Sequence, residues 1–175
     1  SEGLSSPRIF FSIAVFFIYS CATSTMSVDV IGLDDPLEEK IKVTSYNYSK
    51  PFILAVGQAD YFFRAYIDKS SRNKNIQLYV QFNSSDWIFW DRVKFDTGNG
   101  LEVFDVSRVG SDVDCSQYGC SHYEDVVFKI EKGWLESWAK TGKTLRFFST
   151  RVSTHRDVSV TIEEAKAFLE KLSSL

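Results

Sequence analysis

The sequence has few of the residues that build metal sites and disulfide frameworks, with three cysteines and two histidines among 175 residues. It also lacks an excess of positive charge, since 20 Lys and Arg residues stand against 23 Asp and Glu residues and the net charge is -3 at pH 7. A nucleic-acid surface requires a basic stripe, and none stands out here, so we expect no nucleic-acid partner. No apolar run reaches the roughly 20 residues that a membrane-spanning helix needs.

The remaining composition is that of an ordinary globular domain, with 44% hydrophobic and 25% charged residues. A chain of this length buries a core without the help of a metal or of many disulfides. The composition therefore calls for neither a metal nor a cofactor.

The N-terminal segment from Arg8 to Cys21 has the pattern of an export signal. One positive charge precedes an apolar run from Ile9 to Tyr19, and the small residue Ser20 follows. The run is short for a membrane span but suits the apolar region of a secretory signal. The alternative is a buried core helix, but no polar face interrupts the run as an amphipathic helix would require. The pattern predicts export, with residues 1–21 as the leader.

The end of this leader, Ile18-Tyr19-Ser20-Cys21, resembles the lipobox of bacterial lipoproteins, although the bulky Tyr19 departs from the usual pattern. The resemblance implies that Cys21 is lipidated, becomes the new N-terminus and anchors the protein to a membrane. Residues 22–33 then form a small, polar tether, and residues 34–175 form a single domain. We expect the protein in the cell envelope, facing the periplasm. The alternative for Cys21 is an ordinary buried cysteine.

The other two cysteines, Cys115 and Cys120, form a local pair, and in an exported chain we predict a disulfide between them. It closes a short loop, which limits its contribution to about 2 kcal/mol in the chain-entropy model. The alternative is a zinc site that adds His122 and either Asp112 or Asp114. The spacing matches no common zinc finger, so the disulfide is favoured.

The body of the domain has the pattern of a sheet protein. Turn-forming residues separate eight strand-like segments, at 41–48, 59–68, 76–82, 87–95, 101–109, 122–130, 144–151 and 157–162. The pattern predicts a mainly β fold, an antiparallel β-sandwich of about eight strands with one short helix and a C-terminal amphipathic helix. The alternative is an α+β fold with the helices layered on one sheet.

Both helices have recognisable ends. Residues 132–141 form the first, which stops at Gly142, a residue suited to the left-handed end of a helix. The second begins at Thr161, because Thr161 and Glu164 form a capping box. It should pack on the sheet through an apolar stripe made of Ala165, Phe168, Leu169 and Leu172.

The stretch Asp96-Thr97-Gly98 has the signature of an aspartic protease, whose chemistry needs two such loops so that paired carboxylates share a proton. This chain offers one copy, so a hydrolase would have to be a dimer. Asn99-Gly100, which follows between two strand-like segments, is a strong hairpin signal because both residues accept positive φ angles. We interpret the stretch as a turn.

A second candidate for catalysis is the pair His122 and Glu124. Alternation along a strand places both on one side, which Val126 and Phe128 continue and which should be the buried side. The pair fits either a proton-transfer couple or a structural hydrogen bond, and we favour the latter.

The most unusual segment is rich in aromatic residues on both sides of an expected strand. Trp87 and Phe89 would face one way, and Ile88 and Trp90 the other. One side belongs to the core, and the second is either covered or exposed as a binding surface. An exposed Trp87 or Trp90 would stack on sugar rings or hold an apolar group of a protein partner.

The arrangement of Arg108, the pair Cys115 and Cys120, Glu124 and a helix ending at Gly142 resembles small, functionally uncharacterised bacterial envelope lipoproteins. The resemblance implies export and a sheet-rich fold, and it supplies no catalytic residue. We therefore expect a non-enzymatic exported lipoprotein with a binding or envelope-maintenance role, whose partner is a protein or a carbohydrate. The alternative is a hydrolase that uses Asp96 in a dimer, or His122 with Glu124.

Overall fold

The structure is a computed structural model that describes residues 27–46, 57 and 59–175. The expected leader, Cys21 and the first part of the expected tether lie outside these residues. In chain order the elements are β1 (Ser27–Ile31), β2 (Lys40–Tyr46), β3 (Ala59–Asp68), β4 (Lys74–Ser84), β5 (Arg92–Asp96), β6 (Leu101–Asp105), β7 (Ser107–Ser116), β8 (Gly119–Ile130), α1 (Lys132–Thr141), β9 (Lys143–Phe148), β10 (His155–Val160) and α2 (Ile162–Ser173).

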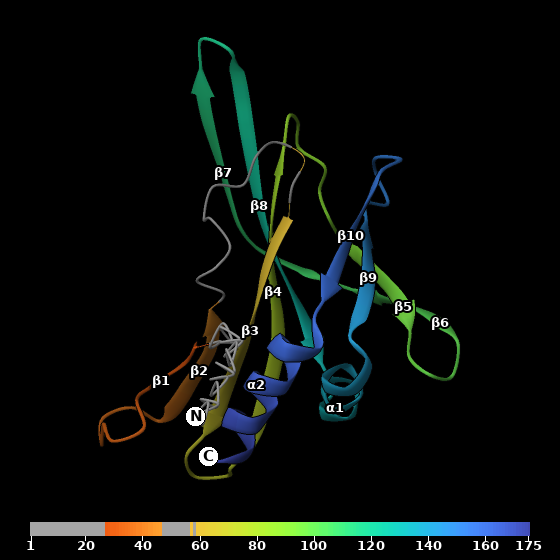
Figure 1. Cartoon of the computed structure of the whole chain (residues 1–175). Helices are drawn as coiled ribbons and strands as arrows, with labels where there is room; N and C mark the ends of the chain where they lie inside the picture. The colour runs from red at the N-terminus through yellow and green to blue at the C-terminus, as the bar shows by residue number, and fades with distance from the viewer. Residues whose placement is uncertain (1–26, 47–56, 58) are drawn as a thin grey trace, which may run out of the picture.

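The strands form two antiparallel sheets, which confirms the predicted β-sandwich (Figure 1). A six-stranded sheet has the order β1-β2-β3-β4-β8-β7, and a four-stranded sheet has the order β10-β9-β5-β6. No helix within the described ranges has both the length and the apolar character needed to cross a bilayer.

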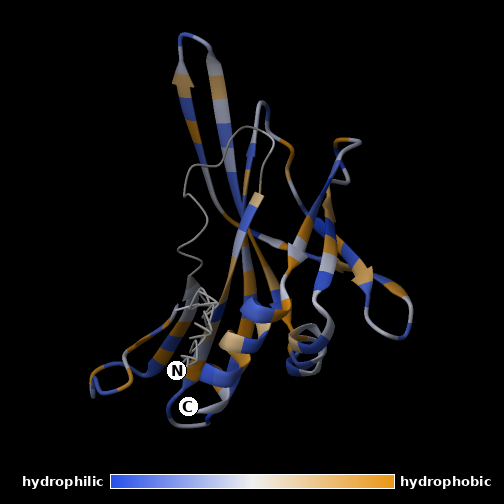
Figure 2. Cartoon of the chain, viewed as in Figure 1, coloured by the Kyte–Doolittle hydropathy of each residue, from blue (hydrophilic) through white to orange (hydrophobic). Residues whose placement is uncertain are grey.

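The core lies between the six-stranded sheet and a second layer made of the four-stranded sheet and the two helices. The sheets meet through aromatic side chains: the ring centroids of Phe82 and Phe147 are 5.4 Å apart, and those of Phe95 and Phe128 are 5.8 Å apart. Hydrophobic and hydrophilic residues alternate along the strands, so one face of each sheet is available for this contact (Figure 2). The largest fully buried side chains are Trp138, Phe63, Phe82, Phe95, Phe147, Phe168, Ile41, Ile67, Leu78, Leu135, Leu145 and Leu172.

Helices α1 and α2 confirm the sequence prediction. Helix α1 ends at Gly142, whose φ of 66° lies in the left-handed region, and α2 begins after Thr161, whose hydroxyl accepts a hydrogen bond of 3.2 Å from the Glu164 amide. The apolar stripe of α2 packs on the six-stranded sheet, where the rings of Phe168 and Phe63 stack with centroids 5.2 Å apart. The stripe matters because an isolated helix of this length is marginal in water.

Two expected strands differ from the observed ones. The expected strand 101–109 is divided at Val106 into β6 and β7, which belong to different sheets. The Val106 amide donates to the Asp91 carbonyl at 3.1 Å, and this bond marks the point where the chain leaves one sheet for the other. The expected strand 87–95 starts only at Arg92, because residues 87–91 form a loop whose amides are bound elsewhere.

The six-stranded sheet also starts earlier in the chain than the expected domain boundary near Asp34. Residues 27–31, which the sequence assigned to the tether, form β1 and pair with β2, with Val30 opposite Val43. Val28 and Val30 pack against the core, so this segment belongs to the folded domain.

Strands β7 and β8 extend beyond the rest of the sheet as a hairpin (Figure 1). Near its tip Cys115 and Cys120 are direct cross-strand partners joined by a disulfide, which confirms the predicted pairing. Because each sulfur is bonded to the other, this pair is not a zinc site. Tyr118, in the turn between the two cysteines, is 91% exposed. The disulfide therefore stabilises the hairpin locally and adds nothing to the core.

We expect Phe168→Ala to lower the free energy of unfolding by about 3–5 kcal/mol, because it removes a buried ring that stacks on Phe63 and leaves a cavity between α2 and the sheet. Chemical denaturation measures the change. The matched control is Lys166→Ala, two residues earlier on the exposed face of α2, which should cost no more than about 0.5 kcal/mol. Equal effects of the two substitutions would contradict the packing of α2 on the sheet.

Candidate functional site

The connection between β4 and β5 contains an unusual backbone conformation. It lies in residues 87–91, which we call the tryptophan loop. Phe89 has a φ of 61°, in the left-handed region that bulky side chains rarely adopt. Such a conformation costs about 1–3 kcal/mol and persists only where surrounding contacts hold it. Strained positions of this kind cluster at binding and catalytic sites, so this loop is the first place to look for function.

The contact that holds the loop is the carboxylate of Glu124. It accepts a hydrogen bond of 2.8 Å from the Ile88 amide to Oε2 and one of 2.9 Å from the Phe89 amide to Oε1. Glu124 is 1% exposed and lies on the inner face of β8. A buried carboxylate is stable only when it is paired and hydrogen-bonded, and the two loop amides provide most of that compensation.

The guanidinium of Arg108 lies beside the same carboxylate. Its Nε is 3.8 Å from Glu124 Oε1, and its Cζ is 5.1 Å from the centroid of Trp87 and 5.3 Å from that of Phe89. Arg108 is on β7 just before an irregularity in the register with β8, between Arg108 and Gly110. A bulge of this kind redirects the side chains around it. A Cβ on Gly110 would lie 2.7 Å from Asp125 Oδ2, so a larger residue there would displace the Asp125 side chain.

A second guanidinium, that of Arg151, reaches the same ring from the loop between β9 and β10. Its Cζ is 5.0 Å from the Phe89 centroid. The backbone around it is fixed, since the Thr150 amide donates to Asp91 Oδ1 at 3.0 Å and the Arg151 amide donates to Ser149 Oγ at 3.1 Å. The Thr150 hydroxyl also donates to Asp91 Oδ2.

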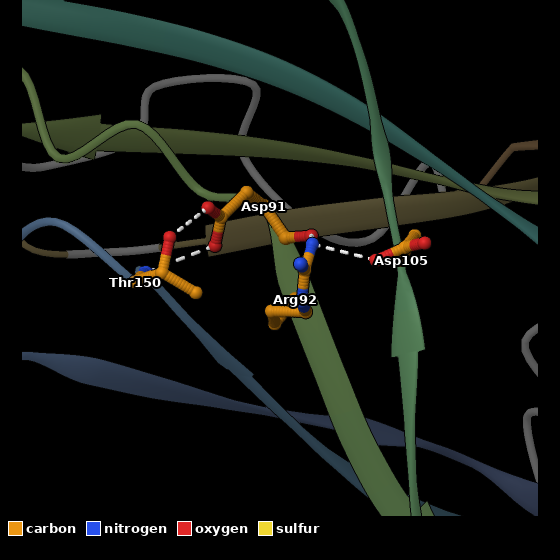
Figure 3. A network of polar contacts seen from close by, with 4 residues as sticks. All are labelled: Asp91, Arg92, Asp105 and Thr150. Carbon is orange, nitrogen blue, oxygen red and sulfur yellow. Dashed lines mark hydrogen bonds and ion pairs between the residues drawn. The ribbon is translucent and has the colours of Figure 1, made fainter.

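Asp91 therefore connects two loops at one end of the sandwich (Figure 3). The same figure shows Arg92, whose Nη1 donates to the Asp91 carbonyl at 3.0 Å and forms an ion pair of 2.6 Å with Asp105. Both oxygens of the Asp91 side chain are occupied by Thr150, so this carboxylate is a structural group.

Between these loops lies a cavity of about 220 Å³, which we call the arginine cavity, lined by Phe89, Trp90, Asp91, Val106, Arg108 and Arg151. Three segments far apart in the sequence build it: the tryptophan loop, the start of β7, and the loop after β9. Its charged groups are two guanidiniums and one carboxylate that is already bound. The arrangement is suited to binding and offers no free base or nucleophile for a covalent step.

A larger hollow of about 560 Å³ lies at the opposite end of the six-stranded sheet, with Lys40, Tyr66, Asp68 and Lys129 in its lining. Asp68 there accepts hydrogen bonds from the Ser70 and Ser71 side chains and amides, which hold its pKa well below the usual range. These bonds close the turn after β3. Arg72 in this turn also has a left-handed backbone, with a φ of 59°, but its guanidinium donates to the Leu175 carbonyl. None of the described residues that line the hollow has a buried polar atom without a partner, so we do not take it as the site.

The two tryptophans expected to bind ligand have different environments. Trp90 is 2% exposed and stacks on Phe82 with centroids 4.4 Å apart, so its ring belongs to the core. Trp87 is half-buried, and its ring meets that of His122 edge to face at 4.7 Å. Of the two, Trp87 has the surface to contact a ligand directly.

Asp96 lies in an exposed hairpin turn between β5 and β6, as interpreted from the sequence. Its Oδ1 accepts a hydrogen bond of 2.8 Å from the Gly98 amide, and the Thr97 amide donates to the Gly100 carbonyl at 3.0 Å. The expected positive φ angles fall on Gly98 and Gly100 and not on Asn99, because the turn has four residues between its paired ends, Asp96 and Leu101.

His122 and Glu124 lie on the inner side of β8, but their functional groups have separate partners. Glu124 binds the tryptophan loop, while His122 packs on Trp87 and its buried Nδ1 has no hydrogen-bond partner in the described part of the chain. Over residues 27–46, 57 and 59–175, no group of three or more His, Cys, Asp and Glu side chains is placed to hold a metal ion.

Comparison of the chain with family models, curated proteins and solved structures gave no match. The candidate site is therefore assigned from the geometry of the structure alone. Sequence reasoning singled out Glu124 and Arg108 without their roles and missed Arg151. The one signal in the sequence was Glu124, whose carboxylate stands on the apolar side of an expected strand. A charge in that position needs hydrogen-bond partners, which the sequence did not identify.

We expect Glu124→Ala to lower the free energy of unfolding by about 3 kcal/mol, because it leaves the half-buried Ile88 and Phe89 amides without their acceptor. Glu124→Gln keeps one acceptor oxygen and should cost about 1–2 kcal/mol. The matched control, Glu136→Ala on the exposed side of α1, should change stability by less than about 0.5 kcal/mol. Denaturant unfolding with hydrogen exchange at Ile88 and Phe89 measures the effect. Unchanged exchange in Glu124→Ala would show that the carboxylate does not hold the loop.

Proposed function

We propose that this protein is an exported, lipid-anchored binding protein of the cell envelope that faces the periplasm and carries out no chemistry itself. The export pattern of residues 1–21, the resemblance of the segment ending at Cys21 to a lipobox, and the resemblance to small envelope lipoproteins support this location. The Cys115–Cys120 disulfide also supports it, because such bonds persist in oxidising compartments.

The observation that carries the binding role is the strained Phe89 held by the buried Glu124 beside the arginine cavity. A loop kept in a costly conformation presents its side chains in one fixed arrangement, and this lowers the ordering cost of binding. The half-buried Trp87 adds an aromatic surface next to that arrangement. A protein or a carbohydrate of the envelope is the class of partner that such a surface suits.

The alternative hydrolase has weaker support. Asp96 uses its carboxylate to close a turn, and Glu124 uses both of its oxygens to hold backbone amides. Among the described residues, neither Asp96 nor Glu124 has a base or a nucleophile as a hydrogen-bond partner, which a proton-transfer mechanism requires.

Purification from the native envelope should give a chain that starts at Cys21, carries a lipid and gains the mass of two hydrogens on reduction, as measured by intact mass. Cys21→Ser should move the protein from the detergent phase to the aqueous phase in detergent partitioning, because the acyl anchor is lost. The matched control, with Cys115→Ser and Cys120→Ser together, should remain in the detergent phase. Recovery of a full-length, uncleaved, reduced chain from the cytosol would overturn the proposed location.

Trp87→Ala should weaken binding of fragments released enzymatically from the host's own envelope by about two- to tenfold, because it removes an aromatic contact worth about 0.5–1.5 kcal/mol. Calorimetric titration of the purified full chain measures the affinity. The control Asp96→Ala should bind as the wild type does. Loss of a hydrolytic activity in a folded Asp96→Ala protein would favour the hydrolase instead.

A further inference from the structure

We infer that the arginine cavity binds an oxyanionic end group of the ligand, a carboxylate or a phosphate, through the guanidiniums of Arg108 and Arg151. The inference rests on the proposed binding function and specifies the chemistry of the group that enters the cavity. It follows from which polar groups around the cavity have partners and which do not.

The unpaired groups at the cavity are hydrogen-bond donors. Arg151 forms no ion pair with any described residue, and its guanidinium donates no hydrogen bond within the described part of the chain. Arg108 approaches Glu124 through Nε at 3.8 Å, longer than a hydrogen bond, and its terminal nitrogens have no acceptor among the same residues. The indole of Trp90 also lines the cavity, and its buried Nε1 has no acceptor there either.

The acceptors nearby are already occupied. Glu124 accepts hydrogen bonds from the Ile88 and Phe89 amides of the tryptophan loop. Asp91 accepts hydrogen bonds from the amide and the hydroxyl of Thr150. A ligand that enters the cavity therefore meets donors and positive charge without a competing free carboxylate. An oxyanion supplies the acceptor oxygens that an arginine fork requires.

The position of the guanidiniums also fits this chemistry. Both lie over the ring of Phe89, with Cζ at 5.3 Å and 5.0 Å from its centroid. A guanidinium that stacks on an aromatic ring keeps its in-plane N–H groups available for bidentate contacts with carboxylate or phosphate. The strained backbone of Phe89 places the ring where both arginines reach it.

The volume limits how much of the ligand enters. About 220 Å³ is less than the 300–1,000 Å³ typical of sites that enclose a whole small molecule. The cavity therefore takes an end group, and the rest of the ligand extends outward next to Trp87. The Trp87 ring is close to the cavity, because Arg108 Cζ lies 5.1 Å from its centroid. The end group belongs either to a carboxylate-bearing chain or to a phosphate ester, and the experiment separates these sources.

The test is an NMR titration of the purified full chain, in buffer free of multivalent anions, with methyl phosphate, acetate and neutral glycerol as probes. The indole N–H of Trp90 and the Nε–H of Arg151 should shift saturably with at least one oxyanion and not with glycerol. Arg151→Gln should weaken that binding at least tenfold, and Arg151→Lys, which keeps the charge but loses the fork, should weaken it less. The matched control, Lys166→Gln on α2, removes one exposed charge far from the cavity and should bind as the wild type does.

Tighter binding of methyl phosphate identifies a phosphate ester as the source, and tighter binding of acetate identifies a carboxylate. The inference fails if neither oxyanion shifts the Trp90 indole saturably, or if Lys166→Gln weakens binding as much as Arg151→Gln. If envelope fragments bind in a Trp87-dependent way while the oxyanions do not, the oxyanion site is wrong and the binding function stands. If neither the fragments nor the oxyanions bind, both proposals fail.

Discussion

The buried carboxylate of Glu124 is the interaction on which the candidate site depends. It stands on the inner face of β8 among apolar residues, where an uncompensated charge would be very costly. The amides of Ile88 and Phe89 compensate it, and in doing so they keep residues 87–91 out of any strand. One contact thus satisfies a buried charge, interrupts the sheet and fixes Phe89 in the left-handed region. Phe89 in turn provides the ring on which both arginines lie.

The surrounding strands are arranged around that contact. The chain leaves the four-stranded sheet at Val106 and enters the six-stranded sheet at Ser107, so Arg108 is brought beside Glu124 within two residues of the crossing. The irregular register before Gly110 follows at once. On the other side, Asp91 binds Thr150 and so brings the loop that carries Arg151 to the same place. A crossing between sheets, a bulge and a loop contact therefore converge at one end of a rigid sandwich, where binding residues commonly gather.

Local sequence patterns were sufficient to predict the fold class, both helices, the disulfide and the Asp96 turn. These features depend on local patterns: a capping box at Thr161, a glycine after α1, two nearby cysteines, and turn residues between alternating strands. The tryptophan loop was not predictable in the same way, because residues 87–90 are apolar on both sides like a buried strand, and the acceptor of the Ile88 and Phe89 amides is a carboxylate far away in the sequence. The division at Val106 has a similar cause, since its amide pairs with Asp91, far away in the sequence. Arg151 follows a strand in an exposed loop, and no local pattern indicates that it meets Phe89.

The charge distribution decides what kind of recognition such a site performs. The whole chain is acidic, with a net charge of -3, so long-range attraction does not collect anions on its surface. In the proposed oxyanion site, selectivity would come from short-range geometry, because guanidiniums match an oxyanion far better than a neutral group. The Glu124 oxygens accept the backbone amides of Ile88 and Phe89, and Oε1 lies 3.8 Å from Arg108 Nε. The buried carboxylate therefore supports the loop and also places a negative charge beside Arg108.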